Sequence, residues 1–182
     1  MRVDRRAFLA QLSALSAGLA TGALAPGCRR RPPAAMPTFA AEQRTALDAL
    51  CAHLLPSDDG PGADEAGCSD FIARELAKPE FNLLRAVAES GLQALDAAAQ
   101  RIAAARFADL TTAQREQVLA EVRALRRRGL DGDRFVHLML VLVIEGFLSD
   151  PRHGGNRNGV GWQYVGFKPV RWAPGDDRAW RN

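Results

Sequence analysis

The sequence lacks the motifs that mark most cofactor-binding and catalytic sites. It has no Cys-x-x-Cys-His segment for covalent haem, no glycine-rich phosphate loop between a strand and a helix, and no Gly-x-Ser-x-Gly nucleophile turn. Its three histidines, His53, His137 and His153, are far apart, so each is expected to be a packed or surface residue. A Ser-His-Asp arrangement leaves no such local mark and stays open. We expect this chain to bind no cofactor and no metal ion of its own.

Lysine is also scarce, and positive charge is concentrated at one end of the chain. Only two of the 24 basic residues are lysine, Lys78 and Lys168. Six arginines fall within residues 1–31 beside a single acid, whereas residues 32–182 hold 18 basic and 20 acidic groups, a net charge of −2. A nucleic-acid-binding protein needs a basic surface on its folded part. The charge distribution therefore excludes nucleic acid as a partner.

The N-terminal residues have the pattern of an export signal. Arg5 and Arg6 come just before an apolar Phe8-Leu9 pair, and residues 7–25 are uncharged and rich in small side chains. This pattern resembles the twin-arginine signal, which directs the export of proteins that are already folded. We expect residues 1–27 to be this signal, the twin-arginine translocase to be its partner and the periplasm to be its destination. An uncleaved membrane anchor is the alternative.

The end of the signal allows more than one kind of processing. Ala23-Leu24-Ala25 fits an ordinary cleavage site, but Pro26 directly follows it. The stretch that ends at Cys28 resembles a degenerate lipoprotein box, in which Cys28 would carry a lipid. Residues 28–37, rich in arginine and proline, would then form an extended tether. Otherwise Cys28 is lost with the signal or stays an unmodified thiol.

Cys51 and Cys68 are the two remaining cysteines. In an oxidising compartment such a pair can form a disulfide, which would stabilise the fold by at most about 3 kcal/mol through closure of the intervening loop. Two small buried thiols are the alternative. The spacing does not decide between them, because disulfide formation depends on geometry.

Hydrophobic periodicity predicts an all-α fold for residues 38–182. A chain of 182 residues with 47% hydrophobic and 25% charged residues is typical of a single globular domain. We expect a compact bundle of about five helices and an irregular C-terminal segment rich in glycine and tryptophan. The first four helices are expected at residues 41–55, 64–77, 80–105 and 111–128, and the fifth is expected to start after Asp131 or Asp133 and run through 135–148. Thr111 and Gln114 have the spacing of a capping box at the start of the fourth helix, and Gly129 is expected to end it.

The last expected helix is apolar on nearly all sides from Leu138 to Ile144 and is too short to span a bilayer. A helix of this kind is expected at the buried centre of a bundle. Glu145 would then be a buried carboxylate that needs hydrogen-bond partners. We expect it to hold the following segment by accepting from backbone amides and arginines there. A catalytic acid is the alternative.

The segment from Ser149 to Phe167 has an unusual composition. Five of the 16 glycines lie between positions 154 and 166, and aromatic residues alternate with them. All three tryptophans, at positions 162, 172 and 180, and the only tyrosine fall in the last 21 residues. Tryptophan, tyrosine and arginine are the residue types that anchor protein interfaces. These side chains either form an interface or fold back over the bundle as a lid.

Three stretches carry a family resemblance: the twin-arginine start, residues 54–72 and residues 145–162, with the run Gly-Gly-Asn-x-x-Gly-Val-Gly-Trp as the most specific part. They resemble the gluconate 2-dehydrogenase subunit 3 family, over about residues 38–168. The positions that this resemblance assigns to structure or partner binding are Glu145, Asp150, Pro151, Gly154, Gly155, Asn156, Gly159, Gly161 and Trp162.

The resemblance implies a non-catalytic small subunit of a membrane-associated flavoprotein dehydrogenase. Its partner would be a large FAD-containing subunit of the glucose–methanol–choline oxidoreductase type, often joined by a multihaem cytochrome c subunit. The small subunit would assist the maturation and export of the large one. This role explains why a chain without a cofactor motif carries a signal for folded proteins. An exported lipoprotein that binds some other partner is the alternative.

Overall fold

The computed structural model describes residues 39–169, all within one compact unit of the chain. Several predicted features lie outside the described residues: the export signal with Arg5, Arg6, Phe8 and Leu9, the possible lipidation site Cys28, the 28–37 segment, Trp172 and Trp180. Within residues 39–169, no helix is both long enough and apolar enough to cross a membrane.

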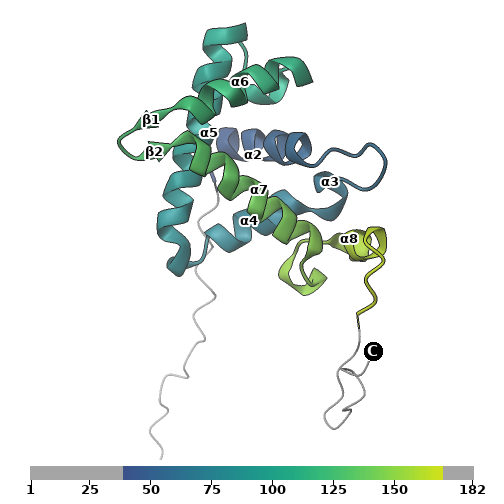
Figure 1. Cartoon of the computed structure of the whole chain (residues 1–182). Helices are drawn as coiled ribbons and strands as arrows, with labels where there is room; N and C mark the ends of the chain where they lie inside the picture. Colours follow the sequence, from purple (N-terminus) through teal and green to yellow (C-terminus); the bar gives the residue numbers. More distant parts are fainter. Residues whose placement is uncertain (1–38, 170–182) are drawn as a thin grey trace, which may run out of the picture. The chain divides into compact units, whose positions relative to one another are not determined.

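The described part of the chain is almost entirely helical, which confirms the all-α prediction (Figure 1). Its α-helices are α2 (Ala41–Leu54), α3 (Ala63–Ala66), α4 (Cys68–Leu76), α5 (Asn82–Ala103), α6 (Thr112–Ala124), α7 (Gly132–Leu148) and α8 (Val160–Tyr164). Short 3-10 helices are η1 (Pro79–Phe81), η2 (Phe107–Asp109), η3 (Pro151–His153) and η4 (Arg157–Gly159). The only strands in this range are β1 (Arg126–Arg127) and β2 (Leu130–Asp131).

Helix α7 is central to this arrangement and packs against α4, α5 and α6 (Figure 1). Its inward side contributes Phe135, Met139 and Val143, which are completely buried. Phe135 lies over Gly91 of α5, where an added Cβ would come within 2.1 Å of the ring. The missing side chain at Gly91 therefore lets α5 and α7 approach each other closely.

Two helices begin where the sequence places a capping residue. The Thr111 hydroxyl accepts from the backbone N–H of Gln114 at 3.4 Å, and the Gln114 side chain accepts from the backbone N–H of Thr111 at 3.0 Å. This reciprocal pair is the capping box that the sequence predicts for the start of α6. The Asp131 carboxylate caps α7 by accepting from the backbone N–H of Arg134.

Two expected helices differ from the observed ones at positions that the periodicity does not reveal. The expected helix at 64–77 is divided into α3 and α4 by Gly67, whose φ of +69° ends one helix and starts the next. The expected helix at 111–128 ends at Ala124 instead, because β1 and β2 pair as a tight hairpin. Gly129, with a φ of +85°, belongs to the turn of that hairpin and does not end the helix.

The expectation that α7 is buried on all sides is wrong for one side of the helix. Leu140, Val141, Ile144 and Leu148 are each 37–48% exposed, although they are as apolar as the residues on the inward side. The described residues therefore cover only part of α7. An apolar stripe of this helix faces solvent.

Candidate functional site

The glycine-rich segment folds back onto the C-terminal end of α7, and Asn156 holds it there. Asn156 is fully buried and has a φ of +45°, a left-handed conformation that asparagine tolerates better than most residues. Its Nδ2 donates to the carbonyl of Ser149 at 2.9 Å, and its Oδ1 accepts from the backbone N–H of Gly161 at 2.8 Å. One side chain thereby ties the end of α7 to the start of α8.

Trp162 completes the cap on α7. Its indole Nε1 donates to the carbonyl of Leu148 at 2.8 Å, so a carbonyl that the helix leaves free at its end has a partner. The ring is half-buried and lies edge-on to Phe167, with 5.2 Å between ring centres. Trp162 therefore packs onto its own domain, as the lid alternative expects for this ring.

Two of the motif glycines are needed because the backbone passes too close to α7 for any side chain. A Cβ added to Gly155 would lie 2.2 Å from the carbonyl oxygen of Gly146. A Cβ added to Gly161 would lie 2.0 Å from the carbonyl oxygen of Phe147. The segment between them therefore lies directly against the end of the helix. Gly154 and Gly159, with φ of +92° and +68°, bend the chain at the ends of η3 and η4.

Asp150 and Pro151 start this segment. Pro151 is the first residue of η3, and the Asp150 carboxylate caps that turn by accepting from the backbone N–H of Arg152 at 3.0 Å. The Arg152 guanidinium also donates to Asp150, and these hydrogen bonds lower the pKa of the Asp150 carboxyl to about 2. Both residues therefore serve the local turn.

Asp70 links the segment to the rest of the bundle. Its carboxylate accepts hydrogen bonds from Arg44 on α2 and from Arg157 on η4, so one acid on α4 joins three elements. The hydrogen bond from Arg44, together with the positive charge of Arg157, holds the pKa of Asp70 below its usual value. Local sequence patterns give no sign of this role, because the three residues are far apart in the chain.

The expectation for Glu145 is wrong. Glu145 is exposed, and within residues 39–169 its carboxylate accepts no hydrogen bond and forms no ion pair. Asn156, and not Glu145, holds the following segment against α7. Glu145 lies about one turn before the end of α7, on a side of the helix that the described residues leave exposed, whereas the sequence pattern predicts a helix buried on all sides.

Cys51 and Cys68 are both buried and both free. The structure therefore corresponds to the alternative of two small buried thiols, and the disulfide is not formed in it. Burial raises the pKa of the Cys68 thiol to about 12 and also raises the pKa of the Cys51 thiol. Such thiols are protonated at neutral pH and unreactive.

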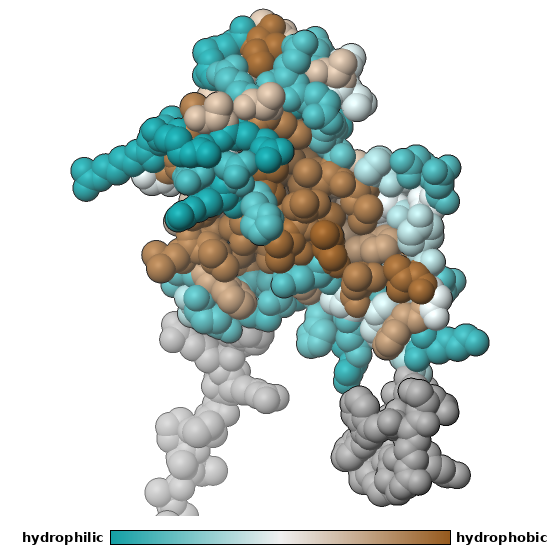
Figure 2. Space-filling model, in the orientation of Figure 1, coloured by the Kyte–Doolittle hydropathy of each residue, from teal (hydrophilic) through white to brown (hydrophobic). Residues whose placement is uncertain are grey.

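The exposed stripe of α7 continues onto residues 149–167, which we call the capping segment. We call the resulting surface the apolar face, and it consists of Val141, Ile144, Leu148, Tyr164, Val165 and Phe167, each 37–59% exposed. Figure 2 shows apolar residues gathered over α7 and continuing towards α8. Tyr164 packs edge-on against Phe147 of α7, with ring centres 6.3 Å apart, so the two parts of the face are held together. Large exposed apolar patches of this kind mark interaction sites.

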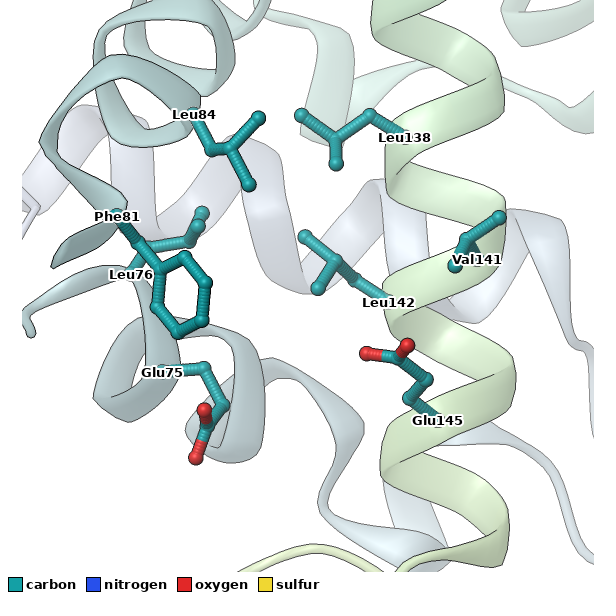
Figure 3. Close-up of a pocket in the computed structure, with 8 residues that line it drawn as sticks. All are labelled: Glu75, Leu76, Phe81, Leu84, Leu138, Val141, Leu142 and Glu145. Atoms are coloured by element: carbon teal, nitrogen blue, oxygen red, sulfur yellow. The ribbon is translucent and has the colours of Figure 1, made fainter.

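A groove of about 250 Å³ borders this face, with α4, η1 and the start of α5 on one side and α7 on the other (Figure 3). Its lining is apolar except at one end, where the carboxylates of Glu75 and Glu145 lie. The lining residues are Glu75, Leu76, Phe81, Leu84, Leu138, Val141, Leu142 and Glu145. Lys78 donates to Glu75 at 2.6 Å, whereas Glu145 has no partner among residues 39–169 and is the unpaired negative charge at this end. Among the described residues, no cluster of three or more histidine, cysteine or acidic side chains could hold a metal ion.

The sequence of this domain matches a known protein family. Residues 41–169 match the gluconate 2-dehydrogenase subunit 3 family, and the chain belongs to it. The family is that of a small subunit of dehydrogenase complexes. The curated proteins and the solved structures contain no match to the chain.

We predict that Asn156→Ala destabilises the protein by roughly 2–4 kcal/mol, because it leaves the Gly161 N–H and the Ser149 carbonyl without partners. The change is measured by chemical denaturation. Asn158→Ala is the matched control: Asn158 also has a positive φ, of 56°, but its side chain makes no hydrogen bond within the described range. Equal losses for the two variants would show that backbone strain, and not hydrogen bonding, explains the effect.

A second prediction concerns pH. The folded-state pKa of Asp70 is lowered, so its contribution to stability is complete above the ordinary pKa of 3.8 and is lost as pH falls through the lower folded value. Asp70→Asn should therefore be clearly less stable than the wild type at neutral pH, and the gap should close on acidification. Thermal unfolding of both proteins between neutral and strongly acidic pH measures this gap. A gap that stays constant with pH would contradict the ion-pair role.

Proposed function

We propose that this chain is a non-catalytic small subunit that binds the large FAD-containing subunit of an exported dehydrogenase. The large subunit would be of the glucose–methanol–choline oxidoreductase type, and a multihaem cytochrome c would be a possible third subunit. The observation that carries this proposal is that residues 39–169 of a member of a dehydrogenase small-subunit family leave an apolar side of a helix uncovered. In this proposal the FAD and the haem c belong to the partners.

The apolar face supports docking because it is both hydrophobic and fixed in position. Ile144 and Leu148 lie on a central helix, while Tyr164 lies on a segment that hydrogen bonds hold against the end of that helix. A preformed apolar surface binds without the entropic cost of ordering a loop. Interfaces of obligate complexes are typically large and apolar at their centre.

The motif residues support docking indirectly. Asn156, Gly155, Gly161 and Trp162 place the capping segment, and the residues that follow them, Tyr164 to Phe167, present the exposed side chains. The most specific part of the sequence therefore acts as a scaffold. The interface anchors are the less distinctive residues beside it.

The export part of the proposal depends on the N-terminal sequence. Arg5 and Arg6 precede Phe8-Leu9 as in a twin-arginine signal, which carries folded proteins. A flavoprotein that folds around FAD before export can travel with a bound subunit that supplies this signal. The complex would reach the periplasm, with lipidation of Cys28 as a possible membrane anchor.

We predict that Ile144→Asp prevents co-purification with the co-expressed flavoprotein subunit, with affinity at least about tenfold lower, because a carboxylate would be buried in an apolar interface. The control is Ile102→Asp: Ile102 is 37% exposed at the far end of α5, outside the apolar face. Both variants are compared with the wild type by affinity capture. Retention of the flavoprotein by Ile144→Asp would place the interface elsewhere.

We also predict that the double variant Arg5→Lys, Arg6→Lys leaves the co-expressed flavoprotein in the cytoplasm while the complex still forms. Cell fractionation and capture of the complex measure the two properties separately. Arrival of the flavoprotein in the periplasm at the wild-type level would refute the carrier role and leave the docking role standing.

A further inference from the structure

The groove beside α7 has the size and chemistry of a seat for one side chain. Its volume of about 250 Å³ is below the roughly 300–1,000 Å³ of small-molecule sites. Phe81 and Leu84 face Leu138 and Leu142 across it, and Glu145 turns its carboxylate towards this apolar lining (Figure 3). An occupant needs a large apolar side chain with a cation next to it.

The chain itself carries a segment of this chemistry beyond the described residues. Arg178-Ala179-Trp180-Arg181 places one indole between two guanidinium groups. An indole fills an apolar hollow with little loss of conformational freedom, and arginine pairs with carboxylates in a fixed geometry. Residues 168–182 as a whole hold four basic groups and two acids, Asp176 and Asp177, so their net charge of +2 is complementary to the carboxylate end of the groove.

The tail is long enough to reach the groove. Phe167 packs on Trp162 with ring centres 5.2 Å apart, and Trp162 donates to the carbonyl of Leu148 at 2.8 Å. Leu148 and Glu145 lie three residues apart on α7, a rise of about 5 Å. From Phe167 to Trp180 the extended chain spans up to about 43 Å. The path along these contacts is well within that reach.

We propose that Trp180 occupies the groove beside α7, with a flanking arginine against the carboxylate of Glu145. The tail then covers an apolar hollow that the described residues leave open. The seat requires a free carboxylate at Glu145, because Glu75 is already paired with Lys78.

This seat has a consequence for assembly, which depends on the docking proposed above. Val141 lines the groove and also belongs to the apolar face. A seated tail and a docked partner therefore compete for the same part of α7.

The test uses two variants of the isolated full-length chain, so it does not depend on any partner. Trp172→Phe keeps Trp162 and Trp180, whereas Trp180→Phe keeps Trp162 and Trp172. Because a buried indole is shielded from solvent, acrylamide should quench the fluorescence of Trp172→Phe about twofold less than that of Trp180→Phe. Equal quenching of the two variants overturns the proposal.

A charge reversal tests whether the groove is the site that protects Trp180 from quenching. Adding Glu145→Arg to both variants should remove the difference in quenching, and the fold should tolerate it because Glu145 is exposed and unpaired in the described structure. Glu89→Arg, on α5 outside the groove lining, is the control that should preserve the difference. A difference that survives Glu145→Arg overturns the proposal.

Other occupants give other results. Protection of Trp180 that appears only after the flavoprotein is added would assign the groove to the partner. Self-association of the chain in light scattering, abolished by Glu145→Arg, would assign it to a second copy. Either result overturns the seating of the tail. Failure of the flavoprotein to co-purify would overturn the proposed function alone, because the quenching measurements contain no partner.

Discussion

The structure depends on the two hydrogen bonds of one buried amide. Asn156 binds the carbonyl of Ser149 and the N–H of Gly161, and by doing so it fixes the chain that follows α7 against the end of that helix. Without these bonds, neither Trp162 nor the exposed apolar residues after it would be held in a fixed position against the last turn of α7. The glycines are the steric condition for this contact, because they let the backbone approach the carbonyls of α7.

Much of the fold could be predicted from the sequence, because its signals are local. The helical periodicity gave α2 to within a residue, and the Thr111–Gln114 capping box placed the start of α6. The errors occurred at glycines. Gly67 and Gly129 both have positive φ, yet one divides a helix and the other turns a hairpin. Which of these a glycine does depends on what the flanking residues pack against, and periodicity contains no such information.

The site was predictable as a segment but not in its details. The glycine and tryptophan run stood out by composition, and its family assignment is confirmed. Glu145 was wrongly expected to be buried, because an apolar helix has the same sequence pattern whether its own domain or another molecule covers it. The role of Asp70 was missed, since Arg44 and Arg157 meet it only in the folded chain. Long-range pairing of this kind leaves no mark in local sequence.

The solvent-facing side of α7 also has a thermodynamic consequence. The exposed hydrocarbon side chains of Val141, Ile144 and Leu148 are in contact with water, and a molecule that covers them releases that water. Release of water from hydrocarbon gives association a negative heat capacity change, and its driving force near room temperature is mainly entropic. Contacts made through this side of the helix should therefore weaken in the cold, whereas the hydrogen-bonded cap at its end should not.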